Sequence, residues 1–124
     1  MRLIGLGWAL AFFAAAAVAQ DAGLEASFHD LIVEQQSDGQ TWLTLRFVSP
    51  RIGPEDGELG YEEVAGDLDR LCDLHGMTAV EESGGADQVY ITLMDRVIER
   101  GVYDPEATMY IGAYKPTADG CVWQ

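Results

Sequence analysis

Two cysteines and one histidine are the residues whose type and spacing suit chemistry best. Cys72 and His75 stand three positions apart in a segment with helical periodicity, so their side chains share a face. Cys121, among the last four residues, adds a second thiol. Two thiolates and an imidazole suit zinc or copper, whereas the two thiols alone form one disulfide. Because the N-terminus described below indicates export, we favour a Cys72–Cys121 disulfide. A metal site of Cys72, His75 and Cys121 is the alternative.

The common catalytic motifs are missing from the sequence. No serine lies in a Gly-x-Ser-x-Gly elbow, no glycine-rich phosphate loop is present, and no Cys-x-x-Cys pair occurs. Paired carboxylates can act as acid and base, but with 21 acidic residues their spacing selects no pair. We therefore expect no cofactor and a non-catalytic protein, with a small carboxylate-based hydrolase or isomerase as the alternative.

Several aromatic residues are candidates for either the core or a binding face. Tyr110 and Tyr114 flank Gly112 on one face of an expected strand, and Trp42 lies in another. Aromatic side chains are enriched at protein interfaces, but in so small a domain they more often complete the core. We interpret Tyr110, Tyr114 and Trp42 first as core residues and second as a possible interaction face.

The N-terminus has the pattern of a secretory signal. Met1 and Arg2 precede an apolar run over residues 3–18, and Ala17 and Ala19 are the small residues that a signal peptidase recognises. The alternative, an uncleaved membrane anchor, needs about 20 apolar residues, more than this run supplies. We predict a signal peptide over residues 1–19, cleaved after Ala19, and a single α+β domain over residues 20–124.

Charge narrows the range of partners. Cleavage would remove 19 of the 124 residues and leave 105, with six basic and 21 acidic residues and a net charge of −15. A protein this acidic is not expected to bind nucleic acid or anionic lipid, because both bind to basic protein surfaces. The chain has no asparagine and so no N-glycosylation acceptor, which fits a bacterial protein. We expect it in the periplasm of a Gram-negative cell, or secreted. Its partner would be a protein of the cell envelope, and it would not contact the membrane after cleavage.

Apolar alternation predicts a hairpin at the start of the domain. Residues 28–36 and 41–49 are two expected strands, and Asp38-Gly39 between them is a strong turn signal. Leu31 and Val33 are expected on a mostly buried face of the first strand. The stretch 50–60, rich in glycine and proline, predicts a surface loop.

The remaining chain predicts one helix and three strands. Apolar residues recur at helical spacing over residues 61–75, and Gly76 is the expected terminator. Strands are expected at residues 88–95, 108–115 and 121–123, with Trp123 on the core side. The order β-β-α-β-β-β indicates an α+β fold. We expect a small antiparallel or mixed sheet of about five strands packed on one main helix, with one disulfide.

Segments in the last third of the chain resemble a known family. They are VYITLMDR at residues 89–96, GVYDPEATMYIGAYK at residues 101–115 and the terminal Cys-x-Trp, together with the Leu71-Cys72 pair. The family consists of short exported bacterial proteins classed as a domain of unknown function, and some members carry the label acetolactate synthase. The resemblance implies no activity, ligand or catalytic residue. Acetolactate synthase encloses thiamine diphosphate and magnesium between large domains, so a 105-residue domain without asparagine or a GDG motif is not that enzyme.

Overall fold

The computed structural model describes residues 24–53 and 59–124. The predicted signal peptide, residues 1–19, and its cleavage site lie outside the described residues, as does the middle of the predicted loop 50–60. No helix of the described segments is long and apolar enough to span a membrane.

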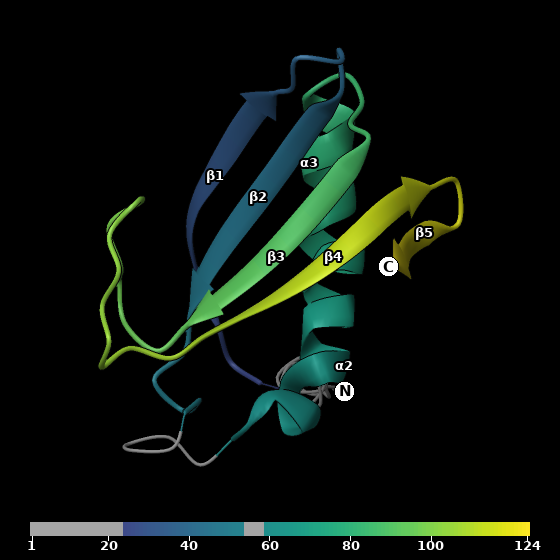
Figure 1. Ribbon diagram of the computed structural model, residues 1–124. Helices are drawn as coiled ribbons and strands as arrows, with labels where there is room; N and C mark the ends of the chain where they lie inside the picture. Colours follow the sequence, from purple (N-terminus) through teal and green to yellow (C-terminus); the bar gives the residue numbers. More distant parts are fainter. Residues whose placement is uncertain (1–23, 54–58) are drawn as a thin grey trace, which may run out of the picture.

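A five-stranded sheet carries one long, interrupted helix against one face (Figure 1). Its strands are adjacent in the order β1-β2-β3-β4-β5. β2 and β3 are parallel because the helix connects them, and the other neighbouring pairs are antiparallel. This architecture confirms the predicted α+β fold with a mixed sheet. The elements are β1 (Ser27–Gln35), β2 (Thr41–Val48), α2 (Tyr61–Leu71), η2 (Cys72–Gly76), α3 (Met77–Glu82), β3 (Gln88–Met94), β4 (Met109–Thr117) and β5 (Gly120–Trp123).

The β1–β2 hairpin turns where the sequence predicted. Gly39 has a φ of 93°, a conformation that favours glycine. The amide of Gln36 donates to the carbonyl of Gln40 at 2.7 Å, and the Asp38 carboxylate accepts from the Gln40 amide at 3.0 Å. The Asp38-Gly39 pair therefore sets the register of the two strands.

One face of the sheet is buried under the helix. Every second residue of β2 and β3 points to this face, as strand geometry requires. The helix adds Val64, Leu68 and Leu71, each at most 4% exposed. The sheet residues that meet them are Leu43, Leu45, Phe47, Val89, Ile91 and Leu93.

The helix does not end at Gly76, as the sequence predicted, but continues to Glu82. Cys72–Gly76 forms a single π-helical turn between α2 and α3. A Cβ on Gly76 would lie 3.0 Å from the Cys72 sulfur and 3.2 Å from a methyl of Val89. Glycine at this position therefore lets the helix lie close against β3. A glycine inside a helix destabilises it by about 1 kcal/mol relative to alanine, and the close packing offsets this loss. The chain turns instead at Gly84, whose φ is 82°.

The predicted disulfide joins the helix to the last strand. Cys72 and Cys121 are bonded, and their Cα atoms lie 6.1 Å apart. The neighbouring carboxylate of Asp73 accepts a hydrogen bond from the Cys121 amide at 2.9 Å. One covalent bond and one hydrogen bond therefore attach β5 to η2.

β1 is less buried than predicted. Leu31 is 39% and Val33 50% exposed, although both side chains point to the helix side of the sheet. The helix makes its main sheet contacts with β3, β4 and β5, and Figure 1 shows β1 clear of it. The prediction of a mostly buried face is wrong because alternation shows which residues share a face, but not how far a helix covers that face.

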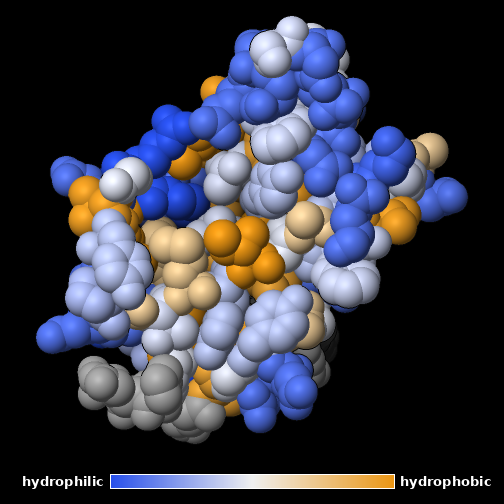
Figure 2. All heavy atoms as spheres, in the orientation of Figure 1, coloured by the Kyte–Doolittle hydropathy of each residue, from blue (hydrophilic) through white to orange (hydrophobic). Residues whose placement is uncertain are grey.

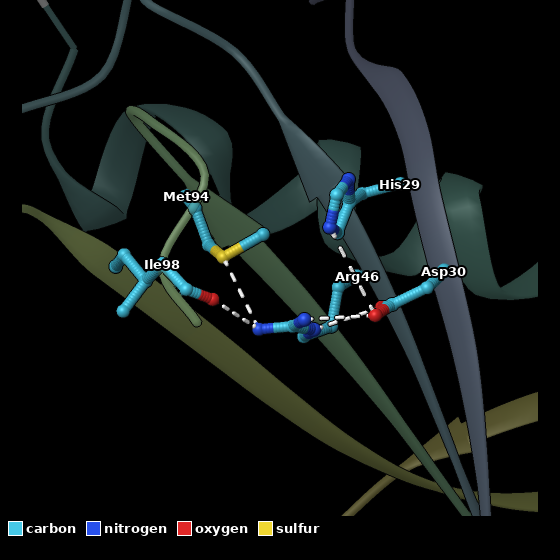
Figure 3. A network of polar contacts seen from close by, with 5 residues as sticks. All are labelled: His29, Asp30, Arg46, Met94 and Ile98. Carbon is cyan, nitrogen blue, oxygen red and sulfur yellow. Dashed lines mark hydrogen bonds and ion pairs between the residues drawn. The ribbon is translucent and has the colours of Figure 1, made fainter. Parts of the chain in front are cut away.

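Arg46 attaches the loop 95–108 to the opposite face of the sheet (Figure 3). Its guanidinium donates to both carboxylate oxygens of Asp30 at 2.8 Å and to the carbonyl of Ile98 at 2.7 Å. Arg46 is only 8% exposed, so these three acceptors satisfy a nearly buried cation. Hydrogen bonding to Arg46 lowers the pKa of Asp30, and the same contact raises the pKa of Arg46.

We predict that Asp30→Asn destabilises the protein near neutral pH and much less in acid. Folding lowers the pKa of Asp30, so the ion pair stabilises the folded protein fully at a pH above 3.8, the ordinary pKa of this carboxyl group. This stabilisation is lost as the pH falls through the lowered pKa of Asp30 in the folded protein. We expect a deficit of roughly 1 kcal/mol at neutral pH, since solvent reaches part of the pair. Urea unfolding of both proteins over a pH series measures this gap. A gap independent of pH would contradict the assignment.

We predict that Cys121→Ala lowers the free energy of unfolding by roughly 3–4 kcal/mol, as expected for opening a loop of this length. Urea unfolding under oxidising conditions measures the loss. A reducing agent should destabilise the wild type to a similar extent and leave the variant unchanged. An unaltered unfolding midpoint in the variant would show that the disulfide does not stabilise the attachment of the last strand to the helix.

Candidate binding sites

Cys72 and Cys121 form a disulfide, and His75 packs against an aromatic ring of the sheet. The disulfide holds both sulfurs, so neither is available as a thiolate ligand in the oxidised protein. His75 is exposed, and its ring lies 5.6 Å from the ring of Phe47. Within residues 24–53 and 59–124, no three or more His, Cys, Asp or Glu side chains are placed to hold a metal ion. The alternative metal site is therefore not assembled.

The three aromatic residues proposed as an interaction face lie on two different faces. Tyr114 pairs with Val89 and is 1% exposed on the helix side of the sheet. Tyr110, on the same side, contacts the ring of Tyr61 at 5.7 Å. Trp42 points to the opposite side and packs against Tyr90 at 5.6 Å. The structure therefore brings the two tyrosines together beside α2 and leaves Trp42 apart.

A groove lies between β1 and the second half of the helix, where the helix leaves the edge of the sheet uncovered. We call it the β1 groove. Its volume is about 220 Å³, and its walls are mainly apolar, with polar side chains on the helix rim. The sheet contributes Phe28, Leu31 and Leu45, and the helix contributes His75, Thr78, Ala79 and Glu82.

The main chain of β1 adds hydrogen-bonding groups to this groove. β1 is the outer strand of the sheet and pairs only with β2. In an antiparallel pair, the main-chain groups of successive residues point alternately toward the partner strand and away from it. Gln36 bonds to Gln40 across the hairpin, so the N–H and C=O groups that point outward belong to Leu31, Val33 and Gln35. No hydrogen bond among the described residues reaches these groups. Leu31 thus combines a side chain that lines the groove with unpaired main-chain groups.

A second cavity lies on the other side of the helix, between α2 and β5. This α2–β5 hollow has a volume of about 300 Å³ and is lined by Tyr61, Ala65, Asp69 and Trp123. The three helix residues lie four positions apart on one stripe, and Trp123 projects from the last strand. Trp123 was expected in the core, but it is 64% exposed because β5 extends past the helix.

Tyr114 is connected to this hollow through Asp69. Its hydroxyl donates to Oδ1 of Asp69 at 2.6 Å. Burial is the main cause that raises the pKa of Tyr114, and the hydrogen bond to Asp69 adds to the effect, so the hydroxyl keeps its proton. The ring lies back over Gly112, where an added Cβ would come within 2.8 Å of it. Glycine at 112 therefore allows Tyr114 to reach the helix.

The face of the sheet opposite the helix carries a third surface. Figure 2 shows hydrophobic atoms gathered in the middle of this face and hydrophilic atoms around them. Met109, Ile111 and Val122 of β4 and β5 are 40–53% exposed, and Tyr103 of the loop is 86% exposed. β5 pairs with β4 only from Tyr114 to Thr117, so Met109 and Ile111 lie on a part of β4 that pairs with β3 alone. The β1 groove differs from this surface because the helix forms its second wall.

Phe28, Tyr61 and Asp69 were not among the site residues predicted from the sequence. Tyr61, Ala65 and Asp69 do stand at i, i+4 and i+8 in the predicted helix, so an aromatic, a small and an acidic residue share one stripe. That spacing was the available signal for the α2–β5 hollow. The β1 groove has no comparable signal, because it depends on where the helix lies across the sheet.

We predict opposite effects for two glycine substitutions. Gly112→Ala should destabilise the protein by about 1–3 kcal/mol, because the new Cβ overlaps the Tyr114 ring. Gly66→Ala, at an exposed helix position with nothing within 4 Å, should stabilise it by up to about 1 kcal/mol. Urea unfolding measures both. If Gly112→Ala is neutral, the ring does not depend on that space.

The comparisons with known proteins identify a family and no individual relative. Searches of curated proteins and of solved structures found no match. Residues 8–124 match the model of a family of unknown function, DUF6497. The match spans nearly the whole chain and agrees with the resemblance noted in its last third. The chain therefore belongs to the DUF6497 family of unknown function.

Proposed function

We propose that the protein is a non-catalytic binding module of the bacterial cell envelope, periplasmic or secreted. It binds a protein partner by adding an extended segment of that partner as a new strand beside β1. One observation carries this proposal: the outward main-chain groups of β1 lie beside the apolar β1 groove.

Strand addition uses both features of this site. An incoming strand gains affinity from main-chain hydrogen bonds and specificity from pockets for alternate side chains. Leu31 and Val33 supply outward N–H and C=O groups, both side chains point to the helix side of the sheet, and Leu31 lines the groove. An apolar side chain of the added strand would enter the groove between Phe28 and Ala79.

The centre of β1, from Leu31 to Val33, lacks the devices that protect an outer strand from pairing. Proteins block such edges with charged residues, proline or bulges. The register of β1 shifts only near its start, between Phe28 and Asp30. The segment from Leu31 to Val33 is uncharged and apolar, and its main chain pairs regularly with β2. An open, regular edge is what a strand-binding site requires.

Charge indicates the chemistry of the partner. The predicted mature domain carries a net charge of −15, and Glu82 lies on the rim of the β1 groove. A segment that alternates apolar and basic residues complements both the groove and the surrounding charge. The Cys72–Cys121 disulfide supports a location outside the cytoplasm, where such bonds persist.

The shifted carboxyl groups fit the alternative, a carboxylate enzyme, less well. A general acid needs a raised pKa. The pKa values of Asp30 and Asp95 are lowered instead, each mainly by a hydrogen bond from an arginine. These carboxylates hold structure together by pairing with cations.

A capped peptide of alternating valine and lysine tests strand addition. We predict that it slows hydrogen exchange at the amides of Leu31, Val33 and Gln35, measured by NMR. Val33→Pro removes one outward N–H without removing a bond to β2, so it should weaken peptide binding about tenfold.

Val33→Thr is the matched control, because it keeps the amide and the side-chain shape, and it should bind within about twofold of wild type. Thermal unfolding confirms that both variants fold. Equal affinity of the proline variant and wild type, or slowed exchange at another strand in place of β1, would refute the proposed site.

A further inference from the structure

Aromatic side chains from two elements line the α2–β5 hollow. Tyr61 of α2 and Trp123 of β5 both line it, and they are 39% and 64% exposed. The rings of Tyr110 and Tyr61 pack edge to face, with their centroids 5.7 Å apart and an interplanar angle of 71°, and this contact stabilises the position of Tyr61. Ala65, one helical turn from both Tyr61 and Asp69, adds only a small side chain to the lining. Aromatic rings attract a cation that lies over their electron-rich faces.

Asp69 supplies a negative charge to the same hollow. One oxygen, Oδ1, accepts the hydrogen bond from Tyr114. The other oxygen, Oδ2, receives no hydrogen bond from any residue that the structure describes. The hydrogen bond from the Tyr114 hydroxyl therefore holds the carboxylate in place through Oδ1 alone.

The cationic residue that follows Asp69 in the sequence is held elsewhere. Arg70 follows Asp69 along the helix, but its guanidinium donates to Asp67 at 2.8 Å and to the carbonyl of Leu24. Asp73, one turn farther along the helix, accepts the Cys121 amide and adds a second negative charge nearby. The hollow is therefore negative and aromatic, with space for a guest.

This chemistry selects one class of ligand. A metal ion such as calcium needs about six oxygen ligands, and this hollow offers one carboxylate. A purely apolar guest would remove water from Asp69 without giving its charge a partner. An alkylammonium group satisfies both the carboxylate and the aromatic faces.

We infer that the α2–β5 hollow binds a small organic cation of the alkylammonium class, between Tyr61 and Trp123 and against Asp69. The cation comes from a free small molecule or from a lysine side chain of another protein. This site lies across the helix from the β1 groove and does not depend on strand addition there.

NMR titration tests this inference with choline and with its neutral isostere, 3,3-dimethylbutan-1-ol. Choline should shift the Trp123 indole resonance saturably. The Trp42 indole, on the opposite face of the sheet, should stay in place. The neutral isostere should bind about tenfold more weakly, because it lacks the charge. A third titration, with N-acetyl-lysine methylamide, compares the two sources of the cation: the tighter of the two cationic probes identifies the natural one.

Asp69→Asn keeps an acceptor for the Tyr114 hydroxyl and should weaken choline binding about tenfold. Asp38→Asn removes the same charge at the distant β1–β2 turn and should leave binding unchanged. Trp123→Leu, followed through the choline methyl resonance, provides a second variant that does not alter the buried hydrogen bond and should also weaken binding. Equal binding of choline and the neutral isostere, or no saturable shift of Trp123, would overturn the inference.

Discussion

The close packing of the helix on β3 determines what the rest of the molecule can cover and expose. Gly76 has no side chain, and the Cys72 sulfur and a Val89 methyl occupy the space beside it. A helix is about 10 Å wide, and strands lie about 4.8 Å apart, so one helix covers roughly two strands. A sheet of five strands therefore extends beyond the helix on both sides. Once the helix lies against β3 and β4, β1 and β5 become the two exposed flanks.

The two flanks differ in chemistry because different elements complete them. On the β1 side, apolar residues such as Leu31 meet the second half of the helix, and the outer strand leaves main-chain groups unpaired. On the β5 side, Trp123 meets the stripe of α2 that contains Asp69, and the disulfide holds the last strand in position. One rigid helix thus forms a wall of two sites that suit different ligands: an extended peptide segment and an organic cation.

Sequence patterns predicted the features that depend on neighbouring residues. The Asp38-Gly39 turn, the alternation of β2 and β3 and the disulfide all follow from local spacing or from the small number of cysteines. The continuation of the helix through Gly76 did not follow, because it depends on contacts with β3 that are distant in sequence. The exposure of Trp123 and of β1 was missed for a related reason. Both depend on the lateral position of the helix across the sheet, which periodicity does not encode.

The contact between Arg46 and the loop 95–108 has a consequence for how this domain can change during evolution. Arg46 recognises the carbonyl oxygen of Ile98, a group that every amino acid possesses. This hydrogen bond therefore constrains the main chain at residue 98, whereas the buried Ile98 side chain restricts the residue type at that one position. The side chains of Val102 and Tyr103, in the same loop, are exposed and contribute little to the stability of the fold. The loop can accumulate substitutions and acquire new surface properties while the sheet beneath it stays the same.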